Sequence, residues 1–274
     1  MSNVTTHVQA LGTTHQRAGR KHQWIILKDL VVLLVQRELR VRYRGSLLGY
    51  LWSFMNPLMQ MIVFAFVFSH IMRFKVEHFP LFLLSGILTW NLIHQSITTA
   101  STSIIYNGPL LRKVKLSSAL FPLVSVFSAL TTFLMAVIPY CLIAIVLGKG
   151  LSWSMLALPI VLLPTLGFLI GVALLIASVN VRFRDVGHML DPILSIVFYG
   201  TPIIYPLEVL PEKYAKILYL NPAVHYVGPI RAVMFEGRLP TIFEFASMTS
   251  FAILALGIGL VIYKRMKKEF IFYV

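Results

Sequence analysis

Six long stretches of this chain contain no aspartate, glutamate, lysine or arginine. They cover residues 45–72, 79–111, 116–148, 150–181, 192–207 and 245–263. A helix needs roughly 18 apolar residues to cross a bilayer, and five of the six stretches are longer than that. Because backbone polar groups have no water to bind inside a membrane, such stretches are expected to fold as helices.

The composition supports a membrane protein. Hydrophobic residues make up 58% of the chain, charged residues only 12%, and the mean hydropathy is +0.81. This leaves too little polar surface for a water-soluble globule, and several buried helices of about thirty residues would not fit in one small soluble domain. We predict an all-α integral membrane protein with six transmembrane helices in residues 45–263. The fifth stretch spans only if residues 186–191 supply its first turns.

The distribution of basic residues predicts the orientation. Seventeen of the 24 lysines and arginines lie on the side of the N-terminus, and seven lie on the other side. Basic residues near the spans stay cytoplasmic, so both termini are predicted to be cytoplasmic, with residues 1–23 as a tail and 264–274 as the C-terminal segment. The net charge of +14 is explained by this topology and by anionic lipid, and no nucleic-acid partner is expected.

Residues 24–44 have the pattern of an amphipathic helix lying along the inner membrane surface. One face is apolar and another carries arginines that can reach phosphate. Two interpretations are open, namely simple anchoring and the reception of a lipid substrate that carries phosphate. The apolar residues are Leu27, Val31, Leu34 and Val41, and the arginines are Arg37, Arg40, Arg42 and Arg44.

Two short basic segments, 107–122 and 181–187, connect long apolar stretches on the predicted cytoplasmic side. Asn107, Gly108 and Pro109 should end the second span and allow a short helix at about 107–117. Each segment is either a solvated loop or a protruding elbow that contacts a partner.

Motifs for chemistry are missing. The sequence has no GxxxxGK[ST] loop for nucleotide phosphates, no HExxH, no DxD and no Cys/His cluster, and its one cysteine, Cys141, lies in the third span. We therefore predict a conduit without enzyme activity, with no metal and no cofactor on this chain. The energy for transport has to come from a partner.

Polar residues within the spans are few. His94 and His70 are interpreted as packed polar groups, with a proton relay as the alternative. Asp191 is expected to hydrogen-bond locally to His188, with a role in gating as the alternative. Gly167 and Gly171 form a GxxxG pattern, for which packing within the subunit is the preferred interpretation.

Aromatic residues gather in the first and fifth spans. Such rings either contact lipid and anchor the helix at the interface, as we expect for Trp52, Trp90 and Trp153, or provide faces on which sugar rings stack. The candidates are Tyr50, Phe54, Phe64 and Phe68 in the first span and Phe198, Tyr199 and Tyr205 in the fifth.

Four motifs in order resemble the permease subunits of type-2 ABC exporters for polysaccharides. They are RVRYRGSLLGYLWSFMNPL at 40–58, NVRFRD at 180–185, TPIIYPLEVLP at 201–211 and NPAVHYVGPIRAVMFEG at 221–237. The resemblance runs from about residue 37 to 263. It implies a homodimer in the bacterial inner membrane and two copies of a separate ABC ATPase subunit that binds ATP and Mg. The cargo would be a glycan linked to undecaprenyl pyrophosphate, such as O-antigen, teichoic acid or capsule.

The resemblance also assigns roles by position. The 107–117 helix would dock on the ATPase, and two short re-entrant helices at 207–219 and 222–235 would dip into the outer leaflet. The candidate ATPase contacts are Arg112, Lys113, Lys115, Arg182, Phe183, Arg184 and Asp185. The candidate glycan path is Tyr50, Phe54, Phe64, Phe68, Phe198 and Tyr199, and the candidate outer gate is Tyr205, Glu208, Asn221 and Arg231.

Two other functions stay open at this point. The same superfamily includes exporters of drugs and other small amphiphiles, and the short outer loops favour the polysaccharide branch over these. A membrane glycosyltransferase or phosphotransferase would use similar lipid substrates, but it should carry acidic metal-binding motifs that this sequence lacks.

Overall fold

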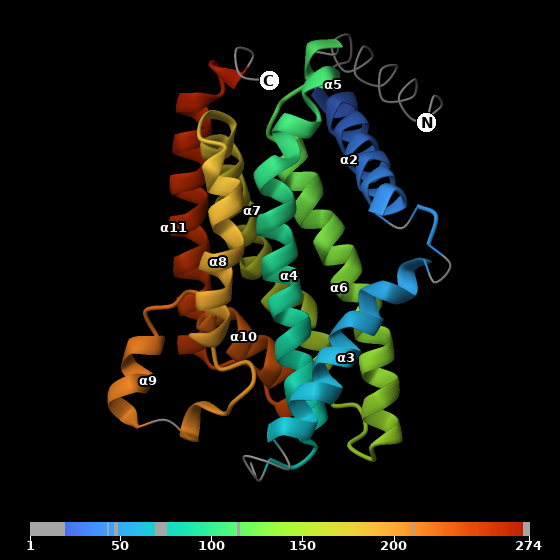
Figure 1. The fold of residues 1–274 in the computed structure, drawn as a ribbon, viewed down its shortest axis with the longest axis vertical. Coiled ribbons are helices and arrows are strands. Elements are labelled where there is room, and N and C mark those ends of the chain that lie inside the picture. The colour runs from blue at the N-terminus through green and yellow to red at the C-terminus, as the bar shows by residue number, and fades with distance from the viewer. Residues whose placement is uncertain are drawn as a thin grey trace.

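The computed structural model describes residues 20–42, 44–46, 49–68, 76–113, 116–209 and 211–270. In these ranges every regular element is a helix, which confirms the all-α prediction for the described part of the chain. Long helices run side by side along the long axis of the molecule (Figure 1). They are α4 (Phe79–Tyr106), α6 (Leu120–Val146), α7 (Leu158–Arg182), α8 (Asp185–Tyr199) and α11 (Ile242–Met266).

Three segments in the described ranges are long and apolar enough to cross a membrane. They are Leu120–Val146, Trp153–Arg182, which joins a 3-10 turn to α7, and Ile242–Met266. Helix α4 has 28 residues without a charge but is rich in serine and threonine. Helices α3 (Trp52–Phe66) and α8 have 15 residues each, about 22 Å of helix against a hydrocarbon core of about 30 Å. The count of six spans therefore stays a prediction.

Helix α4 is the centre of the bundle. It packs against α3, α6, α7, α8 and α10, and it is buried along most of its length. Several of its serines and threonines donate their hydroxyls within the helix, as when Thr89 donates to the Ser85 carbonyl at 2.8 Å, whereas the buried Ser96 hydroxyl has no described partner. A helix of this composition is stable at the centre because protein, not lipid, surrounds its polar groups.

Helices α7 and α11 cross closely through glycines. A Cβ on Gly259 would collide with the carbonyl oxygen of Gly171, and a Cβ on Gly171 would collide with the backbone of Ala255. Gly167 lies one turn away, where its Cβ would be 3.4 Å from that of Ala252. The GxxxG pattern thus serves packing within the subunit, as predicted.

The first predicted span differs from the structure. Helix α3 begins at Trp52, not at residue 45, because Gly45 and Gly49 have φ angles of 76° and 50° that end regular helix before it. A 3-10 turn, Gly49–Leu51, leads into α3. Residues 69–75, which hold the predicted end of this span and His70, lie outside the described residues.

The predicted interface helix is α2 (Arg20–Arg42), and it packs on α6. Leu30 and Leu34 are buried in a cluster with Leu110, Phe121 and Val124. Val41, predicted on the apolar face, is 53% exposed, while Leu30 was not predicted there. The face differs because its buried apolar side chains pack against α6 and its neighbours. The side chain of Leu27 lies outside the described residues.

One end of the bundle gathers the segments that were predicted to be cytoplasmic. The start of α2, the short helix α5 (Gly108–Lys113), the α7–α8 turn and the end of α11 all lie there (Figure 1). The Tyr263 hydroxyl fixes this end, because it accepts from the Ala119 amide at 3.1 Å and lies 2.9 Å from the Ser118 hydroxyl. The grouping fits the predicted topology, and the membrane face that this end occupies stays a prediction.

The opposite end holds short helices between α8 and α11, where two re-entrant helices were predicted (Figure 1). They are η4 (Leu207–Val209), α9 (Glu212–Leu218), α10 (Val224–Arg231) and the π-helical turn η5 (Ala232–Glu236). Helix α10 and η5 are buried, whereas Tyr214 and Ile217 of α9 are each 56% exposed. Each observed helix is shorter than its predicted range, because Pro206, Pro211 and Pro222 interrupt the backbone. Entry into the membrane stays a prediction.

Candidate functional site

A cleft of about 330 Å³ opens between α3, α4 and α8. Aromatic rings form one part of its lining and polar side chains form another. The lining residues are Gln60, Phe64, Trp90, Asn91, His94, Leu194, Ser195, Phe198 and Tyr199.

The aromatic lining is built around Phe198. Its ring centroid lies 5.5 Å from that of Trp90 in an edge-to-face arrangement and 6.4 Å from that of Phe64 with an interplanar angle of 29°. The Tyr199 ring follows at 5.2 Å and is 65% exposed. Rings from three helices therefore share one wall, and such contacts stabilise their orientation.

The polar lining includes His94, and Asp191 of α8 lies beside this histidine without lining the cleft itself. The Nε2 atom of His94 lies 3.7 Å from Oδ1 of Asp191, which is too far for a direct hydrogen bond. The expected partnership of Asp191 with His188 is not seen. Ser195 donates its hydroxyl to the Asp191 carbonyl at 2.8 Å.

The structure brings three predicted path residues together, namely Phe64, Phe198 and Tyr199. Phe54 and Phe68 are half-buried against the same core but do not line the cleft. Trp90 was expected to anchor the protein in lipid, yet it is 6% exposed because α3 and α8 cover it. The side chain of Tyr50 lies outside the described residues.

A second cavity of about 430 Å³ lies between α2, α4 and α6, beneath the predicted lipid-phosphate arginines. Arg37 donates to Oδ1 of Asn107 at 3.1 Å, and Arg42 donates to the Thr99 hydroxyl at 3.5 Å. These contacts tie α2 to both ends of the segment that leads into α5. Arg40 bonds only weakly to Gln36 of its own helix, at 3.4 Å, and Arg44 is exposed in the following turn.

Glu38 is the acidic group of this cavity. Burial raises the pKa of its carboxyl above the ordinary value of 4.5, and the nearby charges of Arg42 and Arg37 oppose the shift. Its Oε1 atom lies 3.6 Å from the guanidinium of Arg42. Sequence reasoning missed Glu38 because its burial depends on the docking of α2 against α6.

The predicted ATPase contacts lie together at the end that holds α5. Arg112 and Lys113 are exposed in the last turn of that helix. In the neighbouring turn Arg182, Phe183, Arg184 and Asp185 are exposed, and Phe183 shows 55% of its surface. Lys115 lies outside the described residues.

Asn180 positions the turn that carries NVRFRD. Its Nδ2 donates to the Ser101 carbonyl and its Oδ1 accepts from the Gly187 amide, both at 2.8 Å. Arg182 forms an ion pair with Glu269 at 3.6 Å, close to the end of α11. The turn is therefore fixed to α4 and α8 by hydrogen bonds.

At the other end Arg231 is buried, with 5% exposure. It donates to the carbonyls of Pro202 and Ile203 at 2.6 and 2.9 Å. Gly86 of α4 leaves room for the guanidinium, because a Cβ there would collide with it. Arg231, predicted at an outer gate, thus joins α10 to the chain that follows α8.

Two other predicted gate residues join the same segments. Asn221 donates to the Gly200 carbonyl and to the Thr201 hydroxyl, both at 2.9 Å, and Tyr205 donates to the Tyr199 carbonyl at 3.0 Å. The side chain of Glu208 lies outside the described residues.

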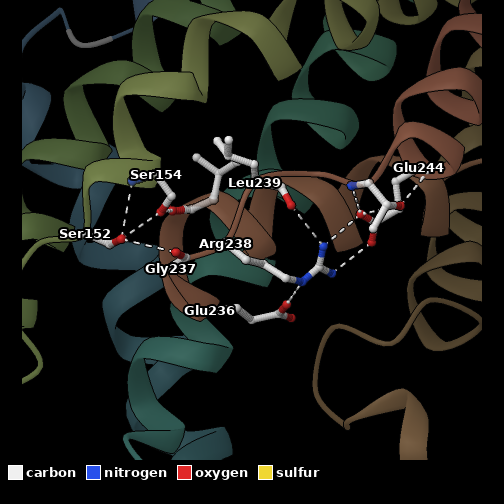
Figure 2. A network of polar contacts seen from close by, with 9 residues as sticks. Ser152, Ser154, Glu236, Gly237, Arg238, Leu239 and Glu244 are labelled. Atoms are coloured by element: carbon white, nitrogen blue, oxygen red, sulfur yellow. Dashed lines mark hydrogen bonds and ion pairs between the residues drawn. The ribbon is translucent and has the colours of Figure 1, made fainter.

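A polar network that the sequence reasoning missed fixes the start of α11 (Figure 2). Arg238 forms a fork with Glu244, at 2.8 and 2.9 Å, and bonds Glu236 at 2.7 Å. The hydrogen bonds that Arg238 donates to Glu244 raise the pKa of the Arg238 guanidinium above its ordinary value. Thr241 and Glu244 form a capping box, and the sequence signal for it was the TIFE run before an apolar stretch.

The same figure shows Ser152 and Ser154 beside Gly237. Ser152 donates to the Gly237 carbonyl at 3.4 Å and Ser154 donates to the Val233 carbonyl at 2.7 Å. The loop between α6 and α7 is thereby tied to the π-helical turn. Within the described ranges, no group of three histidines, cysteines or acids is placed to bind a metal.

Comparisons with known proteins indicate the family of the chain. The family model of the ABC-2 type transporter matches residues 29–235. The chain is 31% identical over 245 residues to an O-antigen export system permease protein, RfbA, of Myxococcus xanthus, which covers 89% of this chain and 94% of the relative. It is 30% identical over 247 residues to the RfbA permease of Klebsiella pneumoniae, with the same coverage.

Capsule permeases are also similar. The polysialic acid transport protein KpsM of Escherichia coli is 27% identical over 249 residues, which are 87% of this chain and 94% of the relative.

Proposed function

We propose, on the premise that this chain belongs to the ABC-2 type transporter family, that it is the transmembrane subunit of a polysaccharide exporter. The observation that carries the proposal is the near full-length likeness to permeases named for O-antigen and polysialic acid. A shared domain alone would leave the cargo open, whereas these alignments cover 94% of the relatives.

The proposed energy source is a separate ABC ATPase, present in two copies, that binds ATP and Mg. The exposed arginine, lysine and aromatic side chains at the α5 end supply a surface for it. Arg112 and Lys113 carry charge. Phe183, in the NVRFRD turn at the same end of the bundle, offers an apolar contact. The chain itself is a transport subunit without catalytic activity.

The proposed path runs along α3 and α8, where aromatic rings face the cleft. We propose that two copies of the chain enclose it, because α8 has a large exposed apolar surface. Met189, Ile193 and Ile196 are 56%, 46% and 74% exposed on that helix. Lipid does not explain the polar groups between these helices, whereas a passage for a hydrophilic polymer does.

The proposed cargo is a glycan on undecaprenyl pyrophosphate that enters from the inner leaflet. Arg40 and Arg44 suit its phosphate, because they are exposed and guanidinium pairs well with phosphate oxygens. Arg37 and Arg42 are held by Asn107 and Thr99, so their proposed role is to position α2. The site of action is the bacterial inner membrane, with both termini in the cytoplasm.

Deletion of the gene in its host tests this proposal. The expected result is loss of one surface polysaccharide and accumulation of its lipid-linked form inside the cell, with both reversed by the wild-type gene. Electrophoresis of surface glycans and mass spectrometry of the lipid fraction measure the two changes. Unchanged surface glycans, together with new sensitivity to a drug or amphiphile, would refute the polysaccharide cargo.

A further inference from the structure

His94, which lines the cleft between α3, α4 and α8, and Asp191, which lies beside it on α8, are slightly too far apart to hydrogen-bond each other. The 3.7 Å between Nε2 of His94 and Oδ1 of Asp191 exceeds a normal hydrogen bond. Both side chains are accessible, with 40% and 78% of their surfaces exposed. At such a separation one hydroxyl placed beside both groups can accept from the imidazole N–H and donate to the carboxylate.

Two amides at the same cleft have no hydrogen-bond partner among the described residues. Gln60 of α3 is exposed and Asn91 of α4 is half-buried, and both line the cleft. Each amide offers donors and an acceptor. Polar side chains between membrane helices usually face a cavity or a polar ligand, because lipid cannot satisfy them.

The cleft also has an aromatic wall, which is apolar where the histidine and the amides are polar. Trp90, Phe198 and Tyr199 present ring faces or edges within one small space. Sugars combine apolar C–H faces, which pack on aromatic rings, with hydroxyls that need hydrogen bonds. The volume of about 330 Å³ is near the lower end of the roughly 300–1,000 Å³ of small-molecule sites, so it suits a short part of a saccharide.

We propose that this cleft is a saccharide-binding subsite in which His94 and Asp191 bind one sugar hydroxyl between them. The inference rests on the proposed function and deepens it, because it assigns recognition of the glycan to named polar residues. The aromatic wall binds sugars with little selectivity. The hydroxyl bridge, in contrast, depends on the position of one hydroxyl and therefore selects among sugars.

A titration of the full-length chain in nanodiscs tests the subsite. Trp90 becomes the single tryptophan after Trp24→Phe, Trp52→Phe and Trp153→Phe, and the probe is lipid-free polysaccharide released by mild acid from the host's own cells. A saturable change in Trp90 fluorescence is expected. His94→Gln and Asp191→Asn should each weaken the apparent affinity about tenfold or more, as expected for a charge-assisted hydrogen bond.

Matched variants separate binding from folding. His188→Gln changes a histidine on α8 outside the cleft and should leave the affinity unchanged. Gln60→Ala removes an exposed side chain without a described partner, so it should weaken binding without altering the melting temperature. Equal affinities for the wild type, His94→Gln and Asp191→Asn would overturn the role of the pair.

Two further outcomes distinguish failure of the subsite from failure of the proposed function. If the host needs the chain for its surface polysaccharide but the purified chain shows no saturable binding, the subsite is overturned and the proposed function stands. A host that exports its glycan normally without the chain would refute the proposed function itself.

Discussion

The guanidinium of Arg231 lies over the ring of Phe82, with its Cζ atom 3.8 Å from the ring centroid. The two residues come from α10 and α4, which are far apart in sequence. An arginine over an aromatic face gains electrostatic attraction, and more so when water is excluded. With its two carbonyl partners, Arg231 therefore joins the short helices at this end to the central helix.

Replacement of Arg231 by lysine should destabilise the protein. A single ammonium cannot reproduce the planar fork that reaches the carbonyls of Pro202 and Ile203 while lying over Phe82. We expect a loss of about 2 kcal/mol, seen as a lower melting temperature of the purified protein in detergent. Arg184→Lys, at an exposed position, is the control. Equal melting temperatures of the two variants would contradict the structural role.

The crossing of α7 and α11 predicts a sharp contrast between two glycines. Gly259→Ala places a methyl group against the carbonyl oxygen of Gly171, whereas Gly257→Ala meets nothing within 4 Å. Overpacking of this kind costs about 1–3 kcal/mol, and an alanine in an open helical position is neutral or favourable. Thermal unfolding of both variants in detergent measures the difference. A melting temperature of Gly259→Ala at the wild-type value would mean that the helices do not meet as described.

Charge reversal at the α5 end should separate partner binding from folding. Arg112→Glu with Lys113→Glu changes two exposed side chains, so the melting temperature should stay within a degree or two of the wild type. Copurification of the proposed ABC ATPase partner should fall at least tenfold. Lys264→Glu, exposed near the end of α11, is the control. Undiminished copurification by the double variant would rule out this surface as the contact.

The all-helical fold could be predicted from the sequence. In a membrane, the backbone of a long apolar run has to form its hydrogen bonds within the run, as a helix does. The breaks at Asn107 and around Pro206 were also readable, since proline and glycine act locally. The start of the first span was missed, because the turn at Gly45 and Gly49 depends on positive φ angles that a charge-free run does not reveal.

The site was readable only in part. Phe64, Phe198 and Tyr199 stood out as aromatic residues at helical spacing and do line the cleft. The pairing of His94 with Asp191 could not be predicted, because it joins residues 97 positions apart through the packing of α8 on α4. Trp90 was misjudged for the same reason, since sequence does not tell which face of α4 other helices cover.

The exposed Arg40 should affect transport without affecting stability. Its described hydrogen bond is a weak one to Gln36 on the same helix, so Arg40→Gln should leave the melting temperature unchanged while reducing surface polysaccharide several-fold. Arg40→Lys should recover part of the export, because it keeps the charge but loses the bidentate fork. Arg37→Gln is the contrasting variant. It should weaken the docking of α2, because it removes the hydrogen bond that Arg37 donates to Asn107. Normal export by Arg40→Gln would exclude a role in binding the lipid phosphate.

The docking of α2 should strengthen on acidification because of Glu38. Burial raises the pKa of this carboxyl above 4.5, so the folded state favours the neutral form. Its stabilising effect is complete below the ordinary glutamate pKa and is lost as the pH rises through the raised value. The 3.6 Å contact with Arg42 opposes this, but such partly exposed pairs contribute only about 0–1 kcal/mol.

Glu38→Gln removes this titration. Amide hydrogen exchange in α2, corrected for the intrinsic effect of pH, should show greater protection for the variant than for the wild type at pH 8, and the two should converge as the pH falls toward 5. Glu77→Gln, with 93% of its side chain exposed, should follow the wild type throughout. If protection in the wild type instead rose with pH, the attraction of Arg42 and Arg37 would outweigh the cost of burying the carboxylate. The cavity beneath α2 would then hold Glu38 as a charged partner of these arginines.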